Sequence, residues 1–109
     1  MLDLQEHGDA IIVRVSGDLD LSNSAEFERA LDVARDGREG PIVLDFGDCR
    51  YIDSSIVSVV VRCRRSVGRR LRVVCATGST VMRILEVLRL IGPLDVVPSV
   101  DEALAAPAS

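Results

Sequence analysis

The sequence contains no lysine: all thirteen of its basic side chains are arginine. Such a chain cannot supply the lysine of a phosphate-binding P-loop, the strand lysine of a protein kinase or the lysine of a Schiff base. Those three kinds of active site are therefore excluded within this chain.

Aromatic residues and long apolar runs are also scarce. Aromatics make up 3% of the chain, so a core must come from the Val, Leu, Ile and Ala that dominate its 48% hydrophobic content. No apolar run approaches the ~20 residues that span a bilayer, and the N-terminal MLDLQEHGD lacks the basic-then-apolar order of a secretory signal. We expect a soluble cytoplasmic protein whose 109 residues form a single domain, with 105–109 as a frayed tail.

Cysteine is limited to Cys49, Cys63 and Cys75, an odd number without CxxC spacing. This pattern speaks against a disulfide framework and a zinc site, so we expect reduced thiols and no metal. Cys63 and Cys75 are interpreted as small core hydrophobes. A redox switch is the alternative, best placed at Cys49 if that thiol is exposed.

The net charge of −4 and the pI of about 4.9 speak against non-specific nucleic-acid binding. The basic residues nevertheless gather in one stretch: Arg62, Arg64, Arg65, Arg69, Arg70 and Arg72. No aromatic side chain interleaves with them for base stacking. We interpret them as a solvated face that complements a helix C-terminus, with contact to an anionic partner as the alternative.

Apolar alternation and turn residues predict several strands. The predicted strands are an N-terminal hairpin at 2–5 and 10–16, buried strands at 42–46 and 71–76, and a short last strand at 94–97.

Apolar residues at helical spacing predict helices between these strands. The predicted helices follow Ser22 or Asn23 up to Gly37, cover 56–67, run from Ser79 to Gly92, and start at Ser99. The expected fold is α/β: a mixed sheet that begins with an antiparallel hairpin, continues in β-α units and is flanked by about four helices.

The most informative stretch is 42–61, where Asp53-Ser54-Ser55 separates two apolar runs. An Asp or Ser just before an apolar run signals a helix N-terminus, because its side chain accepts a free backbone N–H. Ser54 then lies where backbone donors and the helix dipole favour a negative charge, such as a phosphate.

The acidic turn Gly17-Asp18-Leu19-Asp20 is either a solvated strand-to-helix connection or a functional loop. It offers too few oxygen ligands for a divalent ion. His7 lies beside the predicted hairpin turn without a Ser/Asp arrangement nearby in sequence, so we interpret it as exposed and incidental.

In order and spacing, these motifs resemble the STAS domain, which in its single-domain form is the anti-sigma-factor antagonist (anti-anti-sigma factor) of bacteria. The resemblance covers nearly the whole chain. It rests on the turn at 17–20, the strand IVLDF at 42–46, Asp-Ser-Ser at 53–55, and the stretches 73–76 and 94–104.

The resemblance implies a protein with no cofactor and no catalytic activity of its own, which regulates transcription by partner switching. The unphosphorylated form would bind an anti-sigma factor that is also a serine kinase, and so free a sigma factor. Phosphorylation of Ser54 would release the partner, and a serine phosphatase would reset the switch. Nucleic-acid and membrane binding are not expected; a weak homodimer is an open alternative.

The resemblance also implies the residues involved. The expected neighbours of the switch site are Asp20, Asp53 and Ser55. The expected partner-binding residues are Asp18, Asp20, Ser54, Ser55, Ile56, Val57, Ser58 and Val61. Ile56 departs from the family pattern, which has a glycine there, and a bulky side chain could hinder an approaching kinase.

Two other classes of function stay open. One is a non-phosphorylated STAS scaffold subunit of a lipid-transport ATPase complex. The other is an enzyme that uses Asp53, Ser54 and His7, which would require those three groups to lie close together.

Overall fold

The fold begins with an antiparallel hairpin of β1 (Leu2–His7) and β2 (Ala10–Leu19). Gly8 takes a positive φ of 60° in the turn between them, a conformation that glycine adopts without strain. The hairpin prediction is confirmed, although β2 extends further than predicted, to Leu19. The structure, a computed structural model, describes residues 1–106.

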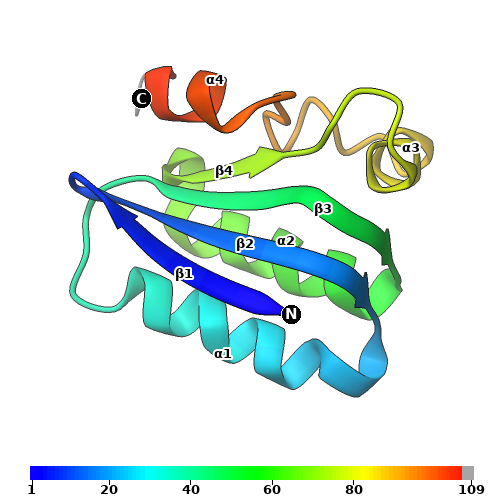
Figure 1. Cartoon of the computed structure of the whole chain (residues 1–109), viewed down its shortest axis with the longest axis horizontal. Coiled ribbons are helices and arrows are strands. Elements are labelled where there is room, and N and C mark those ends of the chain that lie inside the picture. Colours follow the sequence, from blue (N-terminus) through cyan, green and yellow to red (C-terminus); the bar gives the residue numbers. More distant parts are fainter. Residues whose placement is uncertain (107–109) are drawn as a thin grey trace.

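Two further strands, β3 (Ile42–Ile52) and β4 (Leu71–Val74), add to β2 in parallel, so the sheet order is β1-β2-β3-β4 (Figure 1). The predicted mixed sheet is confirmed. The predicted strand at 94–97 is wrong: within residues 1–106, that stretch contributes only an isolated bridge between Val97 and Val74. The residues before Val97 form tight turns, with Asp95 at a positive φ of 49°, and turns cannot continue a ladder.

β3 is longer than predicted because it contains a bulge and not a turn after Phe46. The carboxylate of Asp45 accepts a hydrogen bond from the Gly47 N–H at 2.8 Å. The register against β2 shifts here, from Arg14 opposite Asp45 to Ser16 opposite Asp48. The strand therefore continues to Ile52 and delivers Asp53 and Ser54 to the end of the sheet.

Within residues 1–106, four α-helices and two short 3₁₀ segments cover the sheet. They are η1 (Leu21–Asn23), α1 (Ser24–Arg35), α2 (Ser54–Val67), η2 (Gly68–Arg70), α3 (Thr80–Val87) and α4 (Val100–Ala105). Figure 1 shows α1 and α2 side by side along the sheet, while α3 and α4 lie on the other side of the picture, nearer β4; α3 contacts β3, and α4 contacts β3 and β4.

The predicted helix starts are confirmed: α2 begins at Ser54 after its cap Asp53, and α1 begins at Ser24, directly after Asn23. The hydroxyls of Ser79 and Ser99 accept backbone N–H groups and cap α3 and α4. Ser22 does not cap α1, because Asp20 caps the intervening η1. The helix α4 includes Ala105, so the predicted tail starts too early, and its residues 107–109 lie outside the described part of the chain.

The core is aliphatic, as the composition predicts, with one aromatic contact between Phe27 and Phe46 at a ring-centroid separation of 6.3 Å. A smaller cluster, of Ile12, Val43, Val74 and Ala103, packs α4 against the sheet.

The interpretation of the arginines as a solvated face is wrong for Arg72, which is 5% exposed and donates to the Ala103 carbonyl at 2.6 Å. This bond ties β4 to α4. Arg64 is likewise engaged, in an ion pair with Asp95 at 2.6 Å. Much of the arginine-rich stretch therefore makes structural contacts.

Candidate functional site

The candidate site is the N-terminus of α2, and Asp53 organises it. One carboxylate oxygen of Asp53, Oδ1, accepts the backbone N–H groups of Ser55 at 3.0 Å and Ile56 at 3.2 Å. The Ser55 hydroxyl donates to the same oxygen at 2.5 Å. This hydroxyl is the main cause that lowers the pKa of Asp53, and the backbone N–H groups lower it further. Asp53 is therefore an ionised N-cap.

The second carboxylate oxygen of Asp53 joins the acidic turn to this helix. Oδ2 accepts the Leu21 N–H at 3.0 Å, across 32 positions of sequence. Asp20, the residue before Leu21, accepts the Ser22 N–H at 2.9 Å. The structure thus brings Asp20 to the end of the sheet where α2 begins, as expected.

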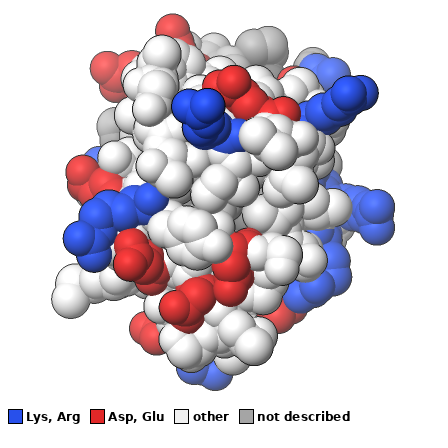
Figure 2. Space-filling view, turned by 90° about the vertical axis from the view of Figure 1, so that its right-hand side faces the viewer, with Lys and Arg blue, Asp and Glu red and all other residues white. Residues whose placement is uncertain are grey.

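Asp18 lies at the same end, because β2 and β3 are parallel and Asp18 pairs with Tyr51. It forms an ion pair with Arg50 at 3.4 Å, and both side chains are more than half exposed. Figure 2 looks at this end of the molecule and shows carboxylates gathered in its lower part beside a largely uncharged surface. The acidic turn is therefore part of the candidate site.

Ser54 and Ser55 differ in their availability. Ser54 is the first residue of α2 and is exposed, and within residues 1–106 its hydroxyl makes no hydrogen bond. The Ser55 hydroxyl is partly buried and held by Asp53. An enzyme acting on this end of the helix therefore meets the Ser54 hydroxyl first.

Some expected partner-binding residues lie in the core. Ile56 is 0% exposed and Val57 is 9% exposed, so neither offers a side chain to a partner. Val57 belongs to a wide buried face of α2, and Val61 also packs against the core. Ser58 is exposed and stays available. Because Ile56 points inward, it does not obstruct the approach to Ser54 as its sequence position suggested.

Sequence reasoning missed two exposed apolar residues at this site. Leu21 is 73% exposed and Tyr51 is 47% exposed. Leu21 contacts Asp53 through its backbone, and Tyr51 lies two residues before Asp53. No periodicity marks either residue; only the rarity of tyrosine, present once in the chain, sets Tyr51 apart.

The cysteines do not form a second site. Cys49, the thiol best placed for a redox switch if exposed, is only 6% exposed, and burial raises its pKa. Burial also raises the pKa of Cys63, and that of Cys75 to about 12. High pKa values disfavour the reactive thiolate, so the structure gives no support to a redox role for Cys49.

His7 and Ser54 lie at opposite ends of the sheet. His7 is exposed and pairs with Ala10 at the start of β2, whereas Ser54 follows the end of β3. The structure therefore does not bring His7, Asp53 and Ser54 together as a catalytic group.

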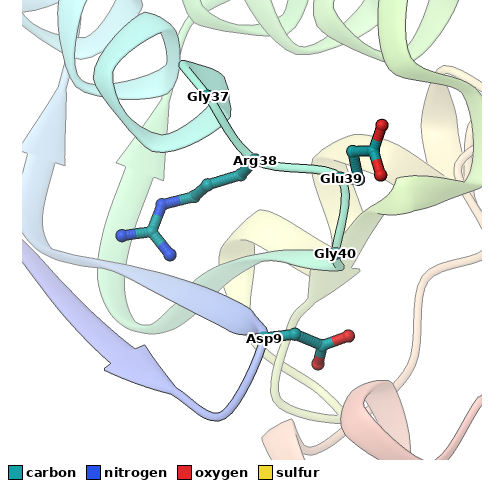
Figure 3. A pocket seen from close by; sticks show the side chains of 5 residues that line it. All are labelled: Asp9, Gly37, Arg38, Glu39 and Gly40. Atoms are coloured by element: carbon teal, nitrogen blue, oxygen red, sulfur yellow. The ribbon is translucent and has the colours of Figure 1, made fainter.

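An open hollow near the His7 end is lined by Asp9, Gly37, Arg38, Glu39 and Gly40. Figure 3 shows that the charged side chains there point in different directions and not toward a common centre. Arg38 pairs with Glu6. The hollow therefore lacks the convergent polar groups of a ligand site.

Residues 1–106 contain neither a cluster of metal ligands nor a helix that could span a membrane. No group of three or more His, Cys, Asp or Glu side chains is placed to hold a metal ion. In the same part of the chain, no helix combines the length and the apolar character needed to cross a membrane.

Comparison with known proteins gives a family match over most of the chain. The family model described as "Mlab, STAS domain" matches residues 2–98. An anti-sigma factor antagonist from Mycobacterium paratuberculosis superposes with a TM-score of 0.84 at 21% identity, over 95% of this chain and 90% of that one.

Two further solved structures show how widely the fold is used. The phosphorylated form of the Bacillus cell fate determinant SpoIIAA gives a TM-score of 0.67 at 21% identity, over 94% of each chain. A sulfate transporter family protein from Wolinella succinogenes gives 0.69 at 18% identity, over 91% of this chain and 84% of that one. At these identities the structural similarities establish the fold.

Proposed function

Because the chain belongs to the STAS-domain family, we propose that it is an anti-sigma-factor antagonist that works by partner switching and is controlled by phosphorylation of Ser54. The unphosphorylated protein binds an anti-sigma factor with serine kinase activity and so frees a sigma factor in the bacterial cytoplasm. The kinase transfers the γ-phosphoryl group of ATP to the Ser54 oxygen, ADP leaves, and the kinase takes the hydroxyl proton. The complex then dissociates, and a serine phosphatase restores the first state. The protein performs no catalysis itself.

The observation that carries this proposal is the exposed, unbonded hydroxyl of Ser54 at the start of α2. A kinase needs a serine whose oxygen is accessible and is not already used in a hydrogen bond. Ser54 is exposed, and its hydroxyl makes no hydrogen bond within residues 1–106. The adjacent Ser55 is held by Asp53 and does not.

The surroundings of Ser54 support a switch that acts through local charge. A phosphoserine carries about −1.5 to −2 charges at neutral pH. Asp53 already occupies the N–H groups of Ser55 and Ile56, so a phosphate on Ser54 competes with that carboxylate for the donors of the first turn. Water screens the added charge in the free protein, and a bound partner removes this screening. We expect phosphorylation of Ser54 to lower the affinity for the partner about a hundredfold, which is within the usual range for coupling between two sites of a protein.

A pull-down from native-host lysate tests the proposal, with the wild type, Ser54→Asp and Ser66→Asp as baits. Ser66→Asp is a matched control: the same substitution at the far end of α2, where Arg35 can pair with the new carboxylate. We expect the wild type and Ser66→Asp to retain a histidine-kinase-like ATPase that Ser54→Asp loses. Incubation of that kinase with ATP should phosphorylate the wild type but not Ser54→Ala. Equal retention by the wild type and Ser54→Asp would contradict the switch.

A second candidate is a STAS scaffold subunit of a lipid-transport ATPase complex that is not phosphorylated. Two observations favour keeping it: the matching family model carries the description Mlab, and α2 opens with Ile56 where the family resemblance implies a glycine. In this candidate function, Ser54 is not a phosphorylation site and is only the first residue of α2. Retention of a transporter ATPase by both the wild type and Ser54→Asp supports this candidate.

A further inference from the structure

Two residues with large, exposed apolar side chains lie at the end of the sheet where α2 begins. Leu21 is 73% exposed and Tyr51 is 47% exposed. The backbone of Leu21 donates to Asp53, and Tyr51 precedes Asp53 by two residues at the end of β3. Both residues therefore lie at the end of the sheet where α2 begins.

Neither residue is needed in the core. The segment η1, which contains Leu21, has no buried residue. Exposed apolar surface is unfavourable in water by about 25 cal/mol per Å². Tyr51 is the chain's single tyrosine, and tyrosine is enriched where one protein binds another. Their exposure therefore suits a surface that a partner covers.

The charges around these two residues suit an interface with a polar edge. Asp18 and Arg50 form an exposed ion pair in the last part of β2 and β3. In Figure 2 the middle of this end is largely uncharged, and basic and acidic side chains lie around it. An uncharged centre with a charged rim is the usual composition of a protein–protein contact.

We propose that Leu21 and Tyr51 are the apolar anchors with which this protein holds its anti-sigma factor, each seated in an apolar pocket of that partner. The inference rests on the proposed function. Seating both anchors brings apolar partner surface over Ser54 and removes water from it. A phosphate cannot lose its water to an apolar surface without a large cost, so the anchors are the reason that phosphorylation of Ser54 releases the partner.

Calorimetric titration tests the anchors against the purified kinase that the wild type retains. The variants are Leu21→Ser, Tyr51→Ser and Tyr51→Phe, with Val33→Ser as the control, because Val33 is 61% exposed on α1 and away from the site. We expect Leu21→Ser and Tyr51→Ser to raise the Kd at least about tenfold. Tyr51→Phe, which keeps the ring, and Val33→Ser should stay within about threefold of the wild type. Circular dichroism checks that each variant is folded.

The outcomes separate this inference from the proposed function. Suppose that Ser54→Asp releases the kinase but Leu21→Ser and Tyr51→Ser bind it as the wild type does. The assignment of Leu21 and Tyr51 as anchors is then overturned, and the proposed function stands. If the wild type binds no such kinase, both are overturned. If the serine variants instead dissociate a homodimer seen by sedimentation and leave kinase binding unchanged, the surface is a self-contact and the inference is overturned.

Discussion

Replacement of Ile56 by glycine, the residue that the family resemblance implies there, is expected to destabilise the protein strongly. Ile56 is 0% exposed in the first turn of α2. Truncation of a fully buried isoleucine to alanine costs about 2–5 kcal/mol, and glycine in a helix costs up to about 1 kcal/mol more than alanine. The expected loss is about 3–6 kcal/mol, a large part of the 5–15 kcal/mol typical of a whole domain.

Urea denaturation followed by circular dichroism would measure this loss for Ile56→Ala and Ile56→Gly. The control is Ser58→Gly, an exposed position on the same helix that should lose about 0.5 kcal/mol from helix propensity alone. At about 4–8 °C per kcal/mol, the melting temperature of Ile56→Gly should fall by more than about 12 °C. A loss for Ile56→Gly no larger than that of Ser58→Gly would refute the assignment of Ile56 to the core. Because Ile56 points inward, the glycine variant should also not be phosphorylated faster while folded.

Three further predictions concern other parts of the molecule. The pKa of Asp53 is lowered below its ordinary 3.8, so its ionised form stabilises the fold above that pH, and this contribution is lost as the pH falls through the lowered value. The stability difference between wild type and Asp53→Asn, from urea titrations, should therefore shrink in acid; a constant difference would contradict this account. Burial raises the pKa of Cys75 to about 12, so a thiol reagent at about pH 8 should label it only after denaturation, and rapid native labelling would contradict its burial. A Cβ at Gly40 would clash with the Asp9 carbonyl oxygen, so Gly40→Ala should cost about 1–3 kcal/mol, whereas Gly92→Ala, with nothing within 4 Å of its Cβ, should not.

The site residues that could be predicted from the sequence are those marked by capping chemistry. Asp53 caps α2, and Ser54 follows it at the first helical position. This could be predicted because an Asp just before an apolar run is a preferred N-cap. The same reasoning placed the starts of α3 and α4 at Ser79 and Ser99. Each of these signals depends only on residues within one helical turn.

Several of the failures depend on neighbours distant in sequence. The family resemblance implies that Val57 binds a partner, but Val57 packs in the core, since the width of a buried helix face depends on what packs against it. The sequence predicts that the strand ends at Phe46, because Gly47-Asp48 suits a turn as well as a bulge, and only pairing with β2 decides between the two. The position of Arg72 in an arginine-rich stretch predicts a solvated side chain, but α4 covers it.

The α/β class, the aliphatic core, the order of the main elements and the serine at the start of α2 could all be predicted from the sequence. They follow from local periodicity, composition and capping, which depend on neighbouring residues in the chain. The folded structure was needed to show that Asp53 binds the Leu21 N–H across 32 positions, that Ile56 points inward, and that Leu21 and Tyr51 lie exposed at the end of the sheet where α2 begins. Parallel pairing of β2 with β3 brings the C-terminal ends of both strands together. This pairing joins segments far apart in the chain, so local sequence patterns do not reveal it.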